Sequence, residues 1–182
     1  MEHRRLERRV RRKVEVVPHN PDWPRQFQRE AERLAAVLGA EIITIHHFGS
    51  TAIAGIPAKP VIDMLIEVRD IEKIDTFNDA LARMGYEAMG EFGISGRRFF
   101  RRQKDGRRTH HVHVYQVDNP EIARHLNFRD YMRVHPVEAA AYGRLKEQLA
   151  RQFPEDMESY VEGKTDFVCR IERKAKLWRD SR

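Results

Sequence analysis

Cysteine and long apolar runs are the features that this sequence has least of. Its 182 residues contain one cysteine, Cys169, so neither an intramolecular disulfide nor a four-cysteine zinc site can form. No apolar stretch approaches the roughly 20 residues of a membrane span. The amino-terminal segment MEHRRLERRVRRK lacks the apolar core of a secretory signal. We therefore expect a cytoplasmic protein with no membrane partner.

Charge is plentiful but unevenly placed. The net charge is +6, yet residues 1–13 carry +5 and residues 97–108 carry +6, which leaves about −5 for the remainder. Such basic segments bind phosphate in nucleotides or nucleic acids, or they are a solvated tail and a charged hairpin. We expect 1–13 to be a disordered tail, 14–172 to be a single domain and 173–182 to be a charged extension.

Apolar periodicity switches between helical and strand periods along the chain. Helices are expected within 20–39, 71–85, 119–134, 136–149 and 154–171, the last with Gly163 as an interruption. Strands are expected at 42–48, 59–68, 97–103 and 109–117, the last two joined at Asp105-Gly106. The segment 86–96 fits neither period. The pattern predicts an α/β (α+β) fold, with a short sheet flanked by helices and a helical carboxy-terminal part.

Two segments in the first half of the chain could bind phosphate and a cation. Gly49-Ser50 follows a strand and precedes a short helical turn, where backbone N–H groups suit a phosphate; alone it could be an ordinary turn. Asp63 lies in a strand whose other face is wholly apolar. A carboxylate in that position can ligate Mg²⁺, or it can cap a turn.

The second half adds histidines and cations. His111 and His113 share one face of a strand, so they could face a metal or supply a base. They could equally be structural. Basic side chains that would neutralise a nucleotide, if the fold brings them together, are Arg98, Arg129, Lys146 and Lys164.

These residues carry a resemblance to a known family. The segments HHFGSTAIAGIPAKPVIDMLIEV, GISGRRFFRR, THHVHV and HLNFRDYMRVHP resemble the GrpB family, small bacterial proteins assigned to the nucleotidyltransferase superfamily. The resemblance runs from about Val14 to Ile171 and implies a nucleotidyltransferase-like fold with a short mixed sheet. In that family the domain also occurs fused to dephospho-CoA kinase.

The superfamily pattern is a Gly-Ser turn, a strand with acids at i and i+2, and a third acid on a neighbouring strand, which together hold Mg²⁺. The resemblance assigns Gly49, Ser50 and Asp63 to the turn and the first acid, and places the third acid at or near His111 or His113. Leu65 occupies the second acid position. Glu67 would lie about 13 Å from Asp63, against about 7 Å for i+2, and is too far to replace it.

We therefore expect Asp63, His111 and His113 to be catalytic and to hold a divalent ion, which could be Mg²⁺, Mn²⁺ or Zn²⁺. The residues expected to bind phosphate or substrate are His47, Gly49, Ser50, Lys59, Arg98 and Arg129. The expected ligand is a nucleotide or a phosphorylated small molecule.

Three functions follow from this site. The leading one is nucleotidyl transfer, and the second is a non-catalytic ligand-binding or folding-assistance module. The third, nucleic-acid binding through the two basic segments, ranks last.

Overall fold

A computed structural model of the chain describes residues 13–182. The predicted tail at 1–13 therefore lies outside the described residues except for Lys13. The described strands are β1 (Ile42–Phe48), β2 (Ile62–Val68), β3 (Tyr86–Ala88), β4 (Arg97–Lys104) and β5 (Arg107–Gln116). The described α-helices are α1 (Trp23–Leu38), α2 (Asn78–Arg83), α3 (Pro120–Val134), α4 (Pro136–Gln152), α5 (Met157–Glu162) and α6 (Thr165–Asp180).

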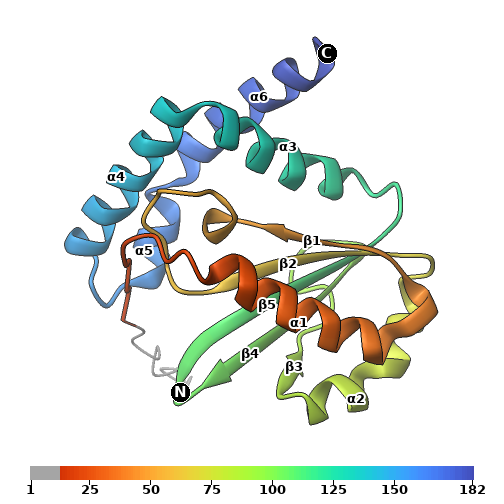
Figure 1. Cartoon of the computed structure of the whole chain (residues 1–182). Coiled ribbons are helices and arrows are strands. Elements are labelled where there is room, and N and C mark those ends of the chain that lie inside the picture. Colours follow the sequence, from red (N-terminus) through yellow and green to blue (C-terminus); the bar gives the residue numbers. More distant parts are fainter. Residues whose placement is uncertain (1–12) are drawn as a thin grey trace, which may run out of the picture.

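The five strands form one mixed sheet in the order β1-β2-β5-β4-β3 (Figure 1). Strand β2 runs antiparallel to β1 and parallel to β5, while β4 runs antiparallel to β5 and β3. The expected α/β class, with a short mixed sheet and a helical carboxy-terminal part, is confirmed. No helix in the described chain is both long and apolar enough to cross a bilayer.

The two faces of the sheet have different chemistry because side chains alternate along a strand. On β2 the even-numbered residues Ile62 to Val68 are buried in the main core with Leu34 and Leu38 of α1. The odd-numbered residues face the other way. There Leu65 packs in a smaller core with Phe48, Tyr115 and Ile122 of α3. We call this second face, which also carries Asp63, the site face.

Helices α3 to α6 follow the sheet, and α3 lies beside α6 (Figure 1). The predicted interruption at Gly163 is confirmed, since it separates α5 from α6. Helix α6 continues through the segment expected to be a charged extension and ends at Asp180. Ala175 in that segment is buried, and the Trp178 ring packs edge-on against Tyr131 of α3.

The expected helix over 71–85 is only partly right. Residues Glu72–Phe77 form a 3₁₀ helix, and only Asn78–Arg83 is α-helical. Apolar residues at 71, 74 and 77 recur every third position, which is the 3₁₀ period rather than the α period. The segment left unassigned contributes β3, a three-residue edge strand.

Candidate functional site

The site begins where β1 ends in the Gly49-Ser50 turn. Phe48, the last residue of β1, pairs with Asp63 across the strands, and Gly49, which follows it, lies close to the carboxylate. Gly49 has φ +70°, and a Cβ placed on it would lie 2.5 Å from Asp63 Oδ2. Both the backbone conformation and this close approach require glycine, and they place the turn against Asp63.

Asp63 is matched on β5 by His111, its register partner. His111 Nδ1 lies 3.4 Å from Asp63 Oδ1. Burial by itself would raise the pKa of Asp63. The hydrogen bond with His111, with the electrostatic effect of His111 and Lys59, outweighs burial, so the net shift lowers the pKa. Asp63 is therefore an ionised carboxylate at neutral pH.

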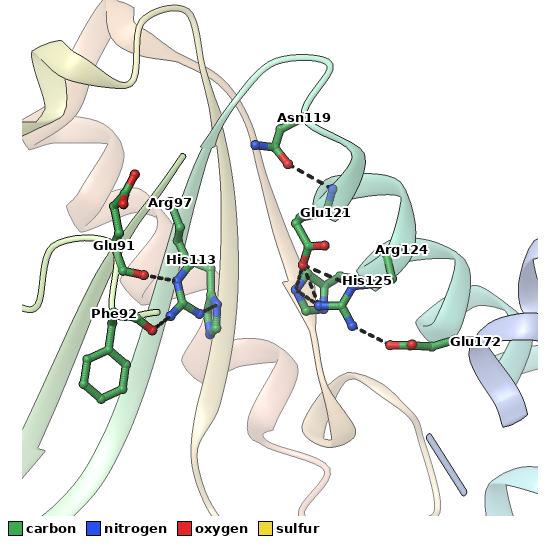
Figure 2. A network of polar contacts seen from close by, with 9 residues as sticks. All are labelled: Glu91, Phe92, Arg97, His113, Asn119, Glu121, Arg124, His125 and Glu172. Atoms are coloured by element: carbon green, nitrogen blue, oxygen red, sulfur yellow. Dashed lines mark hydrogen bonds and ion pairs between the residues drawn. The ribbon is translucent and has the colours of Figure 1, made fainter. Parts of the chain in front are cut away.

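His113 does not join this pair. Arg97 Nη1 donates to His113 Nδ1 at 3.3 Å (Figure 2), and the ring packs edge-on against Phe48 at 5.1 Å between centroids. Burial lowers the pKa of His113 to about 3, so the ring is neutral. The nitrogen that faces Arg97 must accept a hydrogen bond, because guanidinium only donates.

The described structure has no acid next to Asp63 at the second position that the superfamily pattern calls for. Leu65 is fully buried among apolar side chains, while Glu67 Oε1 lies 2.6 Å from His46 Nε2. Within residues 13–182, no group of three or more His, Cys, Asp or Glu side chains is arranged to hold a metal ion. Asp63 and His111 thus stand as a pair.

Three lysines from other parts of the chain lie near Asp63. Lys146 of α4 lies with its Nζ 4.5 Å from the Tyr142 ring centroid. Lys164, between α5 and α6, lies 4.7 Å from the Tyr160 ring centroid, and Lys59 lies 5.5 Å from the same ring. We call Lys59, Lys146 and Lys164 the lysine cluster.

Burial alters the protonation of two lysines of the cluster, Lys146 and Lys164. Lys146 is 2% exposed, and its Nζ has no hydrogen-bond partner among the described residues. Burial, reinforced by the charges of Lys164 and Lys59, lowers the pKa of Lys146 to about 7 against the opposing effect of Asp63. Burial and Lys59 likewise lower the pKa of Lys164 to about 8. Three basic side chains are thus concentrated near Asp63 and the Gly49-Ser50 turn.

Ser50 connects the turn to α4. Its side chain is a hydrogen-bonding neighbour of the Tyr142 hydroxyl, and burial raises the pKa of Tyr142 to about 12. The sequence analysis did not single out Tyr142 or Tyr160. A signal was present for Tyr142, because it precedes Lys146 by four residues on α4, a spacing that brings side chains together on one helix face.

Two of the predicted substrate-binding residues lie elsewhere. Arg98 is on the opposite face of the sheet, where its Nε donates to Asp75 Oδ1 at 2.7 Å. His47 also points away from the site face. Its ring stacks on Phe27 of α1 at 4.8 Å and lies 2.9 Å from Thr51 Oγ1. Strand alternation puts both residues on the α1 side.

Arg129 of α3 contacts the backbone of β1 just before the turn. Its Nη1 donates to the backbone carbonyl of His47 at 3.0 Å, and its Nε donates to Asp130. This position supports the end of β1 rather than the region around Asp63. The structure therefore unites Gly49, Ser50 and Asp63 with His111 and the lysine cluster.

The basic segment 97–108 is divided between the two faces of the sheet, since β4 alternates. Its arginines that form ion pairs are Arg98 with Asp75, Arg101 with Glu87, Arg102 with Glu30, Arg107 with Glu15 and Arg108 with Glu87. Five arginines of the segment are thus spread over both faces and paired with acids, and nucleic-acid binding through it stays a prediction.

Figure 2 shows a polar network that sequence reasoning missed, on the site face beneath α3. Arg97 is 5% exposed and also donates to the backbone carbonyls of Glu91 and Phe92. His125 of α3 lies 5.9 Å from His113 between ring centroids, and Arg124 joins Glu121 to Glu172. The network anchors α3 and the 89–96 loop to the sheet.

The fold and this site define a mixed α/β domain with a polar site face. The family model described as GrpB protein matches residues 13–174, and the chain belongs to the GrpB family. UPF0157 protein YqkA of Bacillus subtilis is 50% identical over 94% of this chain and 50% of its own length, so this chain spans about half of that relative. The crystal structure of conserved protein GrpB from Enterococcus faecalis has a TM-score of 0.86 at 45% identity, covering 90% of this chain and 99% of that one.

More distant similarities involve larger proteins. A protein of Mycolicibacterium paratuberculosis named dephospho-CoA kinase is 28% identical over 94% of this chain and 48% of its own length. The crystal structure of the poly(U) polymerase Cid1 matches 74% of this chain and 43% of its own at 14% identity, with a TM-score of 0.49.

Proposed function

We propose that this protein binds a phosphorylated ligand, a nucleotide or a phosphorylated small molecule, between the Gly49-Ser50 turn and the lysine cluster. The observation that carries the proposal is Lys146, a buried amine with no hydrogen-bond partner among residues 13–182. A buried amine without an acceptor is unfavourable, and burial lowers the pKa of Lys146 to about 7. A phosphate oxygen beside Lys146 would supply the missing acceptor and would favour the charged form of the amine.

The rest of the site supports an anion. Lys59 and Lys164 add basic side chains close to the Tyr160 ring, and Gly49 has no side chain to block a ligand's approach to the turn. Backbone N–H groups in such turns commonly bind phosphate. Asp63 is ionised and can accept a hydrogen bond from a hydroxyl of the same ligand.

Few side chains at this site could bind a divalent ion. Asp63 and His111 offer two ligands, whereas a two-metal centre for nucleotidyl transfer needs several carboxylates. The residues present do not fit a two-metal centre, and we derive no transfer step through one. They suit a single ion bound by one carboxylate and completed by ligand phosphates, as Mg²⁺ often is. Binding, rather than two-metal nucleotidyl transfer, is the function that this donor set supports best.

The proposal is tested by calorimetric titration with tripolyphosphate and ATP, first in EDTA and then with Mg²⁺ or Mn²⁺. We expect Lys146→Met to weaken binding about 10- to 100-fold, the loss typical of one charge-assisted hydrogen bond. Lys176→Met is the matched control, because it removes the same charge from an exposed position on α6. Equal affinity of Lys146→Met and the unaltered protein, or no binding by the unaltered protein, would refute the proposal.

The variant Asp63→Asn distinguishes metal binding from phosphate binding. If Asp63 helps to hold an ion, the variant loses the gain in affinity that Mg²⁺ or Mn²⁺ provides and keeps the binding seen in EDTA. A metal-dependent gain that survives in Asp63→Asn would contradict a role for this carboxylate in holding the ion.

A second candidate function is assistance to an enzyme partner without catalysis. It is favoured by the match of nearly the whole chain to half of a protein named dephospho-CoA kinase. On this proposal the chain raises the yield of active dephospho-CoA kinase when the two are refolded together. An unchanged yield, measured against an equal amount of serum albumin as control, would argue against it.

A further inference from the structure

Two phenylalanines continue the site face from His111 toward the edge of the sheet. The Phe99 ring on β4 lies 5.4 Å from the His111 ring, centroid to centroid. The Phe92 ring stacks on Phe99 at 5.4 Å with an interplanar angle of 23°. Contacts therefore run without a break from Asp63 through His111 and Phe99 to Phe92.

Phe92 is unusual in both exposure and backbone conformation. Its side chain is 56% exposed, and its φ of +46° is in the left-handed region that bulky residues rarely adopt. Arg97 maintains this conformation by donating to the Phe92 carbonyl at 2.7 Å (Figure 2). In addition, the Glu91 side chain accepts from the backbone N–H of Gly96 at 2.7 Å. Strained conformations that the surroundings impose are frequent at ligand sites.

The exposed ring is thus held in place beside the site rather than left on a loose loop. Other exposed apolar side chains, such as Leu177 on α6 and Val137 on α4, are not part of the series of contacts that leads to Asp63. Asp63, His111 and Phe99 lie on three adjacent strands, β2, β5 and β4, so these contacts cross the sheet from the carboxylate to the aromatic pair.

We infer that Phe92, supported by Phe99, is a stacking platform for the base of a nucleotide whose phosphates lie at the lysine cluster. This inference rests on the proposed function and narrows its ligand to a nucleotide. Aromatic side chains bind bases through their π-faces with little preference among bases, so the platform selects for a base rather than for one particular base. His111 then lies between the base and the phosphates, beside the ribose.

The test compares ligands with and without a base. Calorimetric titrations with ATP, UTP and tripolyphosphate in Mg²⁺ are made on the unaltered protein, Phe92→Ala, Phe92→Tyr and Leu177→Ala. We expect both nucleotides to bind more tightly than tripolyphosphate. Phe92→Ala should weaken nucleotide binding roughly 5- to 100-fold and leave tripolyphosphate binding unchanged. Phe92→Tyr keeps an aromatic face and should retain most of the affinity, while Leu177→Ala should change nothing.

The outcomes separate this inference from the proposed function. If tripolyphosphate binds as well as the nucleotides, or if Phe92→Ala leaves nucleotide affinity unchanged, the platform is wrong and phosphate binding stands. If Phe92→Ala weakens tripolyphosphate to the same extent, Phe92 acts on the loop rather than on a base, and the inference is again overturned. Failure of all three ligands to bind the unaltered protein removes both. Because Phe92 is exposed, circular dichroism of Phe92→Ala should match that of the unaltered protein.

Discussion

Glu30 and Lys146 are both buried charged residues, at 3% and 2% exposure, but their surroundings differ. Glu30 of α1 accepts hydrogen bonds from Tyr86 at 2.9 Å, Arg102 at 2.7 Å and Arg33 at 2.9 Å. Lys146 lies against the Tyr142 ring, near Lys59, Lys164, Asp63 and Glu147, and its Nζ has no hydrogen-bond partner within the described chain. Complete hydrogen bonding is typical of a structural element, whereas a buried amine without an acceptor is consistent with a site that a ligand completes.

The comparison predicts opposite effects on stability. Glu30→Ala leaves the Arg102 guanidinium and the Tyr86 hydroxyl without their shared acceptor. We expect the free energy of unfolding to fall by about 3–5 kcal/mol, the usual result of breaking a buried pair from one side. Urea unfolding followed by circular dichroism measures it, with the exposed Glu32→Ala on the same helix as control. A loss no larger than that of the control would show that the Glu30 cluster is not structural.

Lys146→Met should move stability the other way. Methionine fills a similar volume without a buried amine, so we expect the free energy of unfolding to rise by about 1–2 kcal/mol while ligand binding is lost. The exposed Lys176→Met should stay within about 0.5 kcal/mol of the unaltered protein. A clear fall in stability for Lys146→Met would place Lys146 with Glu30 as a structural residue.

The smallest expected effect is a proton taken up on binding. In the free protein, burial and the neighbouring lysines lower the pKa of Lys146 to about 7 and that of Lys164 to about 8. A phosphate favours the charged amines and raises both pKa values, so the complex binds more protons than the free protein above pH 7. At pH 8 the binding enthalpy should therefore vary with the buffer's ionisation enthalpy in the direction of proton uptake. Each of the two lysines takes up at most about one proton. Affinity should fall as pH rises above 8.

The same titration of Lys146→Met provides the check. Uptake should shrink to the part that Lys164 contributes, provided that binding remains measurable. Release of protons, or no dependence on the buffer, would contradict the assignment of phosphate to the lysine cluster.

Much of the fold could be predicted from local patterns. The β-branched run at Ile42 and Ile43, the alternation along β2 and the Asp105-Gly106 turn all predicted elements that the structure contains. The 3₁₀ helix at Glu72–Phe77 was missed because a spacing of three also occurs within α-helical patterns. Strand β3 was missed because three residues carry too little periodicity to be recognised.

The candidate site could be predicted only in part. Gly49, Ser50 and Asp63 lie near one another in sequence, and the structure brings them into contact with His111. Alternation alone showed that Arg98 lies on the face opposite Arg97 and Phe99, but which of these faces carries Asp63 depends on strand pairing. Sequence reasoning therefore assigned Arg98 to the site and missed Arg97.

The sequence by itself determined most of the helices and strands, the family and the residue types able to bind phosphate, because periodicity, turn residues and side-chain chemistry are local properties. Only the tertiary structure decided that Lys59, Lys146 and Lys164 meet beside Asp63, and that Phe92 and Phe99 extend the same face. Those contacts join the loop before β2, α4, the α5–α6 junction and the loop before β4. They depend on how distant elements pack around one sheet, which no spacing along the chain encodes.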